Sequence, residues 1–85
     1  MNSGQMIRLV QELSGEQDVE LLQIPPAEIR YDKQVLHPLR VIRRGTRYLV
    51  EVVEYPGEWW MGELEGDTLV VWGSYGSLDE AAAQH

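Results

Sequence analysis

The hydrophobic positions near the start of the chain follow a helical period. Apolar residues recur every three or four positions over residues 5–14, which predicts an amphipathic helix. These residues are Met6, Ile7, Leu9, Val10 and Leu13. Ser3 can cap the start of this helix, and Gly15 can end it in a left-handed conformation. Because so short a helix is unstable alone in water, we expect it to pack on the rest of the fold.

After the helix the pattern changes to that of β-strands. Residues 19–24 predict one strand, which Pro25 and Pro26 end because proline cannot donate to a β-ladder. The stretch 27–38 is extended in parts, with a break at the His37-Pro38 step. Further strands, rich in β-branched and aromatic residues, are predicted at 39–44, 46–55, 58–64 and 68–72.

Glycine and proline mark the turns between these strands. Gly45 separates the first two, and Gly66 with Asp67 fits a two-residue hairpin turn. Pro56 and Gly57 fit a type II turn. We therefore expect an antiparallel meander over residues 39–72. A C-terminal helix follows it, with Ser77 and Glu80 as a capping box.

These elements predict an α+β fold that is mainly β. The meander can form either a closed barrel or an open sheet of 4–5 strands, with a short helix at each end of the chain. At 85 residues we expect a single domain, 1–85. It comprises an N-terminal helix and strand (1–28), an antiparallel β core (29–75) and a C-terminal helix (76–85).

Two tryptophans stand side by side in the predicted strand 58–64. Neighbours in a strand point to opposite faces, so Trp59 and Trp60 cannot enter the same core. We expect one indole inside and the other on the outer face, available to a partner. This interpretation predicts an exposed Trp59 with Trp72 or Tyr75 beside it. The alternative is that the aromatic residues are packing only, since a chain without Phe must build its core from Trp and Tyr.

The composition of the chain excludes several kinds of catalytic and metal-binding site. The chain has no Cys, so disulfides and thiolate sites are excluded. His37 and His85 have no second ligand at metal spacing, and no nucleophile, paired-carboxylate or phosphate-loop pattern is present. We therefore expect neither an enzyme nor a cofactor. No apolar run is long enough to span a membrane and no signal-peptide pattern opens the chain, so a cytoplasmic location is expected.

Charge is unevenly distributed along the chain. The net charge of −7 argues against nucleic-acid binding. Six of the seven basic residues lie between positions 30 and 47, and residues 51–85 hold eight acidic residues and no Lys or Arg. One interpretation is that opposite charges face each other on neighbouring strands. The other is an anion-binding patch at Arg43, Arg44 and Arg47.

The stretch WWMGELEGDTLVVWGSY resembles the signature of SH3 domains: a Trp pair, x-G-E-L, a hairpin Gly, an apolar strand and a Tyr. Tyr31-Asp32 and Gly45 resemble upstream positions of that family. The resemblance implies a five-stranded barrel that binds an extended proline-rich peptide, with Tyr31, Trp59 and Tyr75 lining the groove. The family's groove proline falls at Trp72, the loop after Tyr31 is basic rather than acidic, and the last strand is missing.

A second stretch, YGSLDEAAA after the strands, resembles the β-β-β-α layout of HicB-like antitoxins.

The sequence as a whole leaves two functions open. The first is a protein- or peptide-binding module that uses the aromatic surface of Tyr31, Trp59, Trp72 and Tyr75. The alternative is a structural or regulatory subunit, antitoxin- or adaptor-like, that acts as a dimer or with an obligate partner. Either a monomer or a homodimer fits, and neither a membrane nor a nucleic acid is an expected partner.

Overall fold

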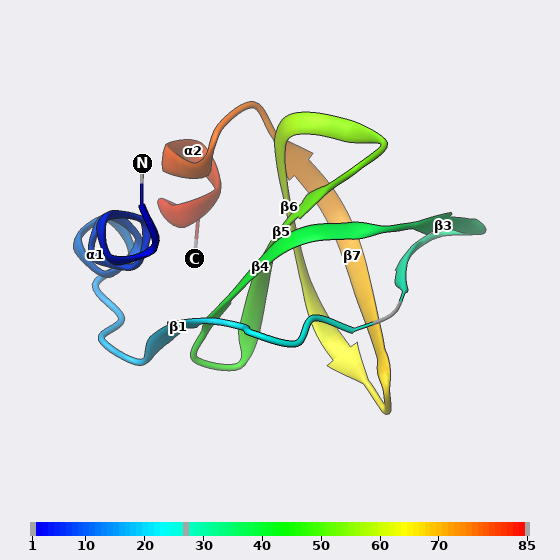
Figure 1. Cartoon of the computed structure of the whole chain (residues 1–85), viewed down its shortest axis with the longest axis horizontal. Helices are drawn as coiled ribbons and strands as arrows, with labels where there is room; N and C mark the ends of the chain where they lie inside the picture. Colours follow the sequence, from blue (N-terminus) through cyan, green and yellow to red (C-terminus); the bar gives the residue numbers. More distant parts are fainter. Residues whose placement is uncertain (1, 27, 85) are drawn as a thin grey trace.

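The computed structural model describes residues 2–26 and 28–84 and shows an α+β fold that is mainly β. His85 lies outside the described residues. Two short helices accompany seven strands (Figure 1). In chain order they are α1 (Ser3–Ser14), β1 (Val19–Leu21), β2 (Ile29–Tyr31), β3 (Gln34–Leu36), β4 (Pro38–Arg44), β5 (Arg47–Val52), β6 (Tyr55–Glu65), β7 (Thr68–Tyr75) and α2 (Leu78–Ala82).

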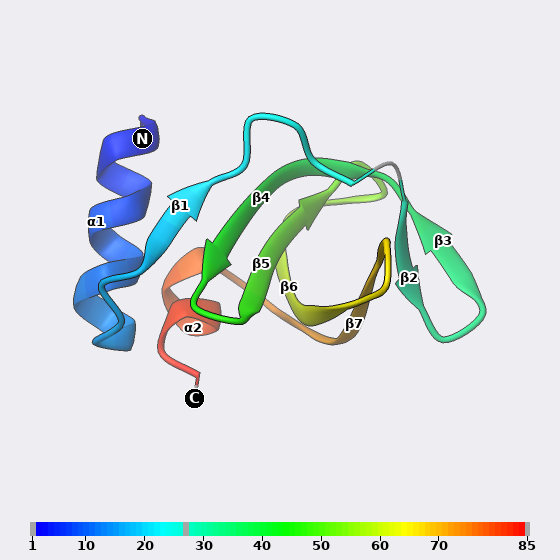
Figure 2. The same cartoon turned by 90° about the horizontal axis from the view of Figure 1, so that it is seen from below.

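All seven strands form one mixed sheet that is not closed, in the order β1-β4-β5-β6-β7-β2-β3. The strands from β4 to β7 pair antiparallel in chain order, as predicted for residues 39–72. The sheet has more than the four or five strands predicted, because the β2–β3 hairpin was not expected, whereas the strand predicted at 19–24 is present as β1. β2 pairs parallel with β7. Only His37 separates β3 from β4, so the sheet curls strongly (Figure 2).

The curled sheet has a core on each face. The core inside the curl contains Ile29, Leu36, Val41, Val50, Val52, Trp60, Leu69 and Val71. The core beneath the two helices contains Met6, Val10, Ile42, Leu49, Trp59, Met61, Leu78, Ala81 and Ala82. Adjacent residues of one strand enter different cores because strand side chains alternate between faces.

Local chemistry explains where the helices begin and end. α1 ends at Gly15, which has φ +77° as predicted, but its cap is Asn2 rather than Ser3. The Asn2 side chain accepts from the Gln5 N–H at 2.9 Å, and the Gln5 side chain accepts from the Asn2 N–H. At α2 the Ser77 hydroxyl accepts from the Glu80 N–H, whereas the Glu80 carboxylate accepts from Gly76.

One predicted turn is wrong. Gly45 and Gly66 occupy turns with positive φ, as expected. Gly57 also has a positive φ, +88°, but it lies with Pro56 within β6 rather than in a turn. The chain reverses at residues 53–54 instead, and the pairing of β5 with β6 is irregular next to that turn. The Glu51 carboxylate accepts a hydrogen bond from the Gly57 N–H at 3.1 Å, which holds the irregular stretch against β5.

Candidate functional site

Trp59 is enclosed rather than presented to solvent. Its side chain is only 4% exposed and packs in the core beneath the two helices. Tyr75 lies opposite it on β7 and packs on the same core. The expectation of an exposed Trp59 is therefore wrong. The two indoles do point to opposite faces, but both faces of the sheet are covered, so neither indole is left outside.

Trp72 is the tryptophan that reaches the surface, with 48% exposure. Met61 pairs with Gly73 and Gly62 pairs with Val71, so Trp72 is an extra residue that forms a bulge in β7. The Arg47 guanidinium lies 5.8 Å from the centre of its ring. The structure thus separates Trp72 from the ring of Trp59 and brings it to Arg47.

Tyr31 lies apart from both Trp59 and Trp72. Its ring meets the Trp60 ring edge-on, with 4.8 Å between ring centres, and Tyr55 approaches the same indole at 5.7 Å. The four aromatic residues predicted to form one surface are therefore distributed over three. Only Trp59 and Tyr75 share a core, and Tyr31 is joined by two residues, Tyr55 and Trp60, that the predicted site did not contain.

We call the cluster of Tyr31, Gln34 and Tyr55 above Trp60 the tyrosine surface. Tyr31 is 36% exposed and Tyr55 is 38% exposed, whereas Trp60 is 6% exposed and closes the core below them. Tyr31 and Gln34 face each other across the β2–β3 hairpin. The Gln34 Nε2 donates to the Tyr55 hydroxyl at 3.2 Å. This hydrogen bond joins β3 to the start of β6 through the Tyr55 hydroxyl.

Trp60 has an unsatisfied donor. Among the described residues, its indole Nε1–H has no hydrogen-bond acceptor, although the atom is buried. A buried donor without a partner costs about 1–3 kcal/mol. The Trp60 ring therefore contributes apolar packing to the core, while its Nε1–H lacks a hydrogen bond.

Exposed apolar residues are frequent in the segments that carry or adjoin the tyrosine surface. Five of the nine large hydrophobic residues that are exposed in the described structure come from β2, β3, the start of β4, the β5–β6 turn and the start of β6. They are Tyr31, Val35, Leu39, Val53 and Tyr55. Hydrogen bonds from Gln34 to Tyr55 and between His37 and the β5–β6 turn join these segments. β3 is also an outer strand of the sheet, with no partner on one side.

Hydrogen bonds between Glu54 and His37 fix the turn beside this surface. The Glu54 carboxylate accepts from the His37 backbone N–H at 2.9 Å and lies 2.5 Å from its Nδ1. The backbone N–H and then the imidazole of His37 hold the pKa of the Glu54 carboxyl below its ordinary value. Val53 also donates to the His37 carbonyl at 2.9 Å, so the β5–β6 turn is tied to the β3–β4 junction.

The three arginines of the predicted anion patch do not act as one group. Arg43 forms two hydrogen bonds with Asp18, at 2.9 and 3.0 Å, and these raise its pKa. Arg44 is buried and donates to the Ala82 carbonyl at 2.9 Å. Arg47 lies beside Trp72. Only Arg44 and Arg47 line a common hollow, of about 270 Å³.

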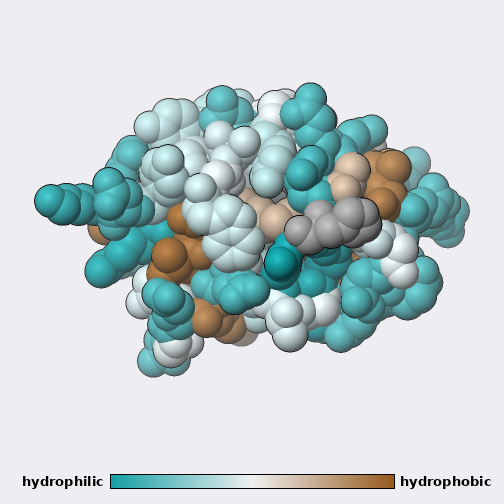
Figure 3. Space-filling model, turned by 180° about the vertical axis from the view of Figure 1, so that it is seen from behind, coloured by the Kyte–Doolittle hydropathy of each residue, from teal (hydrophilic) through white to brown (hydrophobic). Residues whose placement is uncertain are grey.

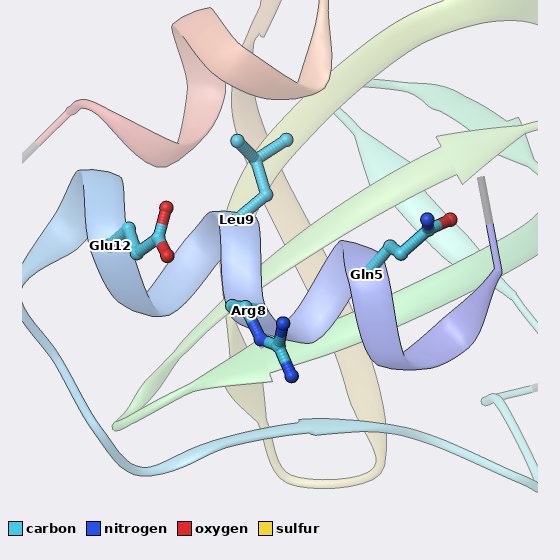
Figure 4. A pocket seen from close by; sticks show the side chains of 4 residues that line it. All are labelled: Gln5, Arg8, Leu9 and Glu12. Atoms are coloured by element: carbon cyan, nitrogen blue, oxygen red, sulfur yellow. The ribbon is translucent and has the colours of Figure 1, made fainter.

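Two other hollows do not add to the tyrosine surface. One, of about 440 Å³, is lined by Gln5, Arg8, Leu9 and Glu12, all from α1 (Figure 4). In that view Leu9 points towards α2 and Arg8 points away from it, so this is a hollow on one helix rather than a cleft between elements. The other, of about 190 Å³, lies beside Trp59 and Arg40. Seen from behind, the hydrophobic residues form small patches separated by polar ones (Figure 3).

The sequence could have pointed to Trp60 as part of the site, because alternation along the strand places its ring on the face opposite Trp59. No local sequence pattern marks Tyr55 as a site residue, since Pro56 and Gly57 after it favour a turn. Tyr31 and Tyr55 approach the same Trp60 ring from distant parts of the chain, and this long-range feature has no local sequence pattern.

The described residues contain no group of three or more His, Cys, Asp or Glu residues that could hold a metal ion. No helix in the described part of the chain has the length and apolar character needed to cross a bilayer. Comparisons with protein-family models, curated protein sequences and solved structures found no significant match.

Proposed function

We propose that the chain is a non-enzymatic binding module that takes an extended peptide segment of a partner protein on the tyrosine surface. The observation that carries the proposal is a pair of half-exposed phenol rings seated on a buried indole. Tyrosine at a surface offers apolar contact area and a polar hydroxyl with little conformational entropy to lose, which favours protein recognition.

The neighbouring strand favours an extended ligand. β3 is an outer strand, and an extended peptide can pair with the backbone of such a strand while its alternate side chains reach nearby pockets. Val35 lies on β3 itself, on the face opposite Gln34, and Leu39 and Val53 are further exposed aliphatic residues on neighbouring segments. Apolar side chains at alternate positions of the ligand therefore match this surface best.

The proposal retains part of the likeness to SH3 domains. Of the groove residues implied by that likeness, Tyr31 is on the tyrosine surface, whereas Trp59 and Tyr75 pack beneath the helices. The resemblance to SH3 domains itself stays a prediction, and the ligand need not be rich in proline. The alternative of a structural or regulatory subunit also stays a prediction.

Random-peptide display against the immobilised full chain tests this function. The affinity of each enriched peptide is then measured by titration calorimetry for the wild type, Tyr31→Ala and Tyr55→Ala. We expect each tyrosine variant to bind at least about tenfold more weakly. Both rings are more than one-third exposed, so circular dichroism is expected to show a retained fold.

Trp72→Ala is the matched control, because it removes an exposed aromatic ring from a different part of the sheet. It should change the affinity less than about twofold. The proposal fails if the display yields no peptide, or if the enriched peptides depend on Trp72 rather than on Tyr31 and Tyr55.

A further inference from the structure

Two arginines face each other across the β4–β5 hairpin. Arg44 and Arg47 are directly opposite in the antiparallel register, separated by the turn at Gly45 and Thr46. Like charges at directly opposite positions of two strands destabilise the sheet. The fold nevertheless keeps both, and it buries Arg44 to 8% exposure.

Carboxylates compensate this pair poorly. No carboxylate in residues 2–26 and 28–84 lies within 4.0 Å of the Arg44 guanidinium, and Arg47 reaches only Glu63, at 3.8 Å. By contrast, Arg40 has a carboxylate at 2.6 Å and Arg43 has one at 2.9 Å. Burial, and then the charge of Arg47, lower the pKa of Arg44. The charge of Glu16 acts on Arg44 in the opposite direction, and Glu63 approaches Arg47, but neither carboxylate forms a close ion pair with its arginine.

The same two arginines line a polar hollow of about 270 Å³ beside the turn. Its other lining residues are Ser14, Glu16, Gly45 and Thr46. The Glu16 carboxylate accepts from the Asp18 N–H at 3.0 Å, which holds it to its own loop. Among the residues that line the hollow, two guanidinium groups stand against one carboxylate.

We propose that this hollow binds a phosphate group. A phosphate dianion has enough oxygen atoms to accept from two guanidinium groups at once, and such charge-assisted bonds are the strong ones. Bound between Arg44 and Arg47, it would turn their repulsion into two attractions. The turn lies on the far side of the molecule from β3, so this site is separate from the tyrosine surface (Figure 2).

Amide chemical shifts of the full chain test this site. Inorganic phosphate and O-phosphoserine are titrated separately at constant ionic strength, with the amides of Gly45 and Thr46 as reporters. We expect saturable shifts with at least one probe. Arg47→Gln should weaken binding about tenfold. This side chain is 36% exposed, so its loss should leave the fold intact. Glu16→Gln should strengthen binding, because it removes the carboxylate from the hollow.

Arg30→Gln is the control for general charge effects, because it makes the same charge change on an exposed residue of β2. It should change the affinity less than about twofold. If only O-phosphoserine saturates, the source is a phosphoryl group on a larger molecule; if inorganic phosphate binds equally, the free ion suffices. Shifts that do not saturate with either probe, or an equal loss in Arg30→Gln and Arg47→Gln, overturn the site.

Discussion

At the scale of single residues, Gly62 marks the closest approach of two strands. A Cβ atom at this position would lie 2.1 Å from the Val70 carbonyl oxygen and 2.7 Å from the Val71 Cα. Both neighbouring atoms belong to backbone and cannot rotate away. The register of β6 with β7 also shifts at this residue.

We therefore expect Gly62→Ala to lower the free energy of unfolding by about 3 kcal/mol or more, because the backbone of β7 must move. Gly73 on β7 is the matched control, since a Cβ there has no atom within 4 Å. Gly73→Ala should cost less than about 1 kcal/mol. Urea denaturation measures both values, and equal losses would contradict this explanation of the glycine.

The sequence predicts correctly that Trp59 and Trp60 point to opposite faces of the sheet, but it does not predict how exposed each ring is. The alternation of Trp59 and Trp60 follows from backbone geometry, so the sequence was sufficient to place them on opposite faces. Exposure depends on what covers each face. That covering comes from α1 and α2 on one side and from the curl of the sheet on the other, at large separations in the chain.

At the scale of elements, local sequence signals predict most ends of the helices and strands but not the β2–β3 hairpin. Gly15, Gly45 and Gly66 have the positive φ that their positions predict. The β2–β3 hairpin was not identified because its turn uses Asp32, with φ +55°, rather than glycine. Residues 19–24 were predicted as one strand, but β1 ends at Leu21, where its pairing with β4 stops.

Two hydrogen-bonded pairs between elements predict acid sensitivity. Asp18, before β1, accepts from Arg43 of β4, and Glu54 accepts from His37 beside β4. These contacts lower the pKa of both carboxyl groups in the folded chain. The unfolded chain therefore binds more protons in acid. The stability contributed by both groups is present above their ordinary pKa values and is lost as the pH falls through the lowered ones.

Urea denaturation between about pH 7 and pH 3 measures this effect. We expect the free energy of unfolding of the wild type to fall below about pH 5. The Asp18→Asn, Glu54→Gln double variant should start lower at pH 7 and fall less steeply. If the double variant has the same pH dependence as the wild type, these two pairs are not the origin of the acid sensitivity.

At the scale of the whole molecule, one sheet separates two small cores. A domain of this size buries only a little over about 60% of the surface of its unfolded chain, so using both faces of the sheet increases the apolar area it can bury. Each member of the Trp pair supplies one core with its largest side chain. The exposed aromatic surface then arises at the β3 end, from residues that the sequence did not group.

Nuclear Overhauser contacts of the two neighbouring indoles test this account most directly. We predict that the Trp60 ring protons contact the rings of Tyr31 and Tyr55, and that those of Trp59 contact the methyl groups of Met6 and Leu78. Contacts between Trp59 and Tyr31, or between Trp60 and Leu78, would contradict both the two cores and the tyrosine surface built on one of them.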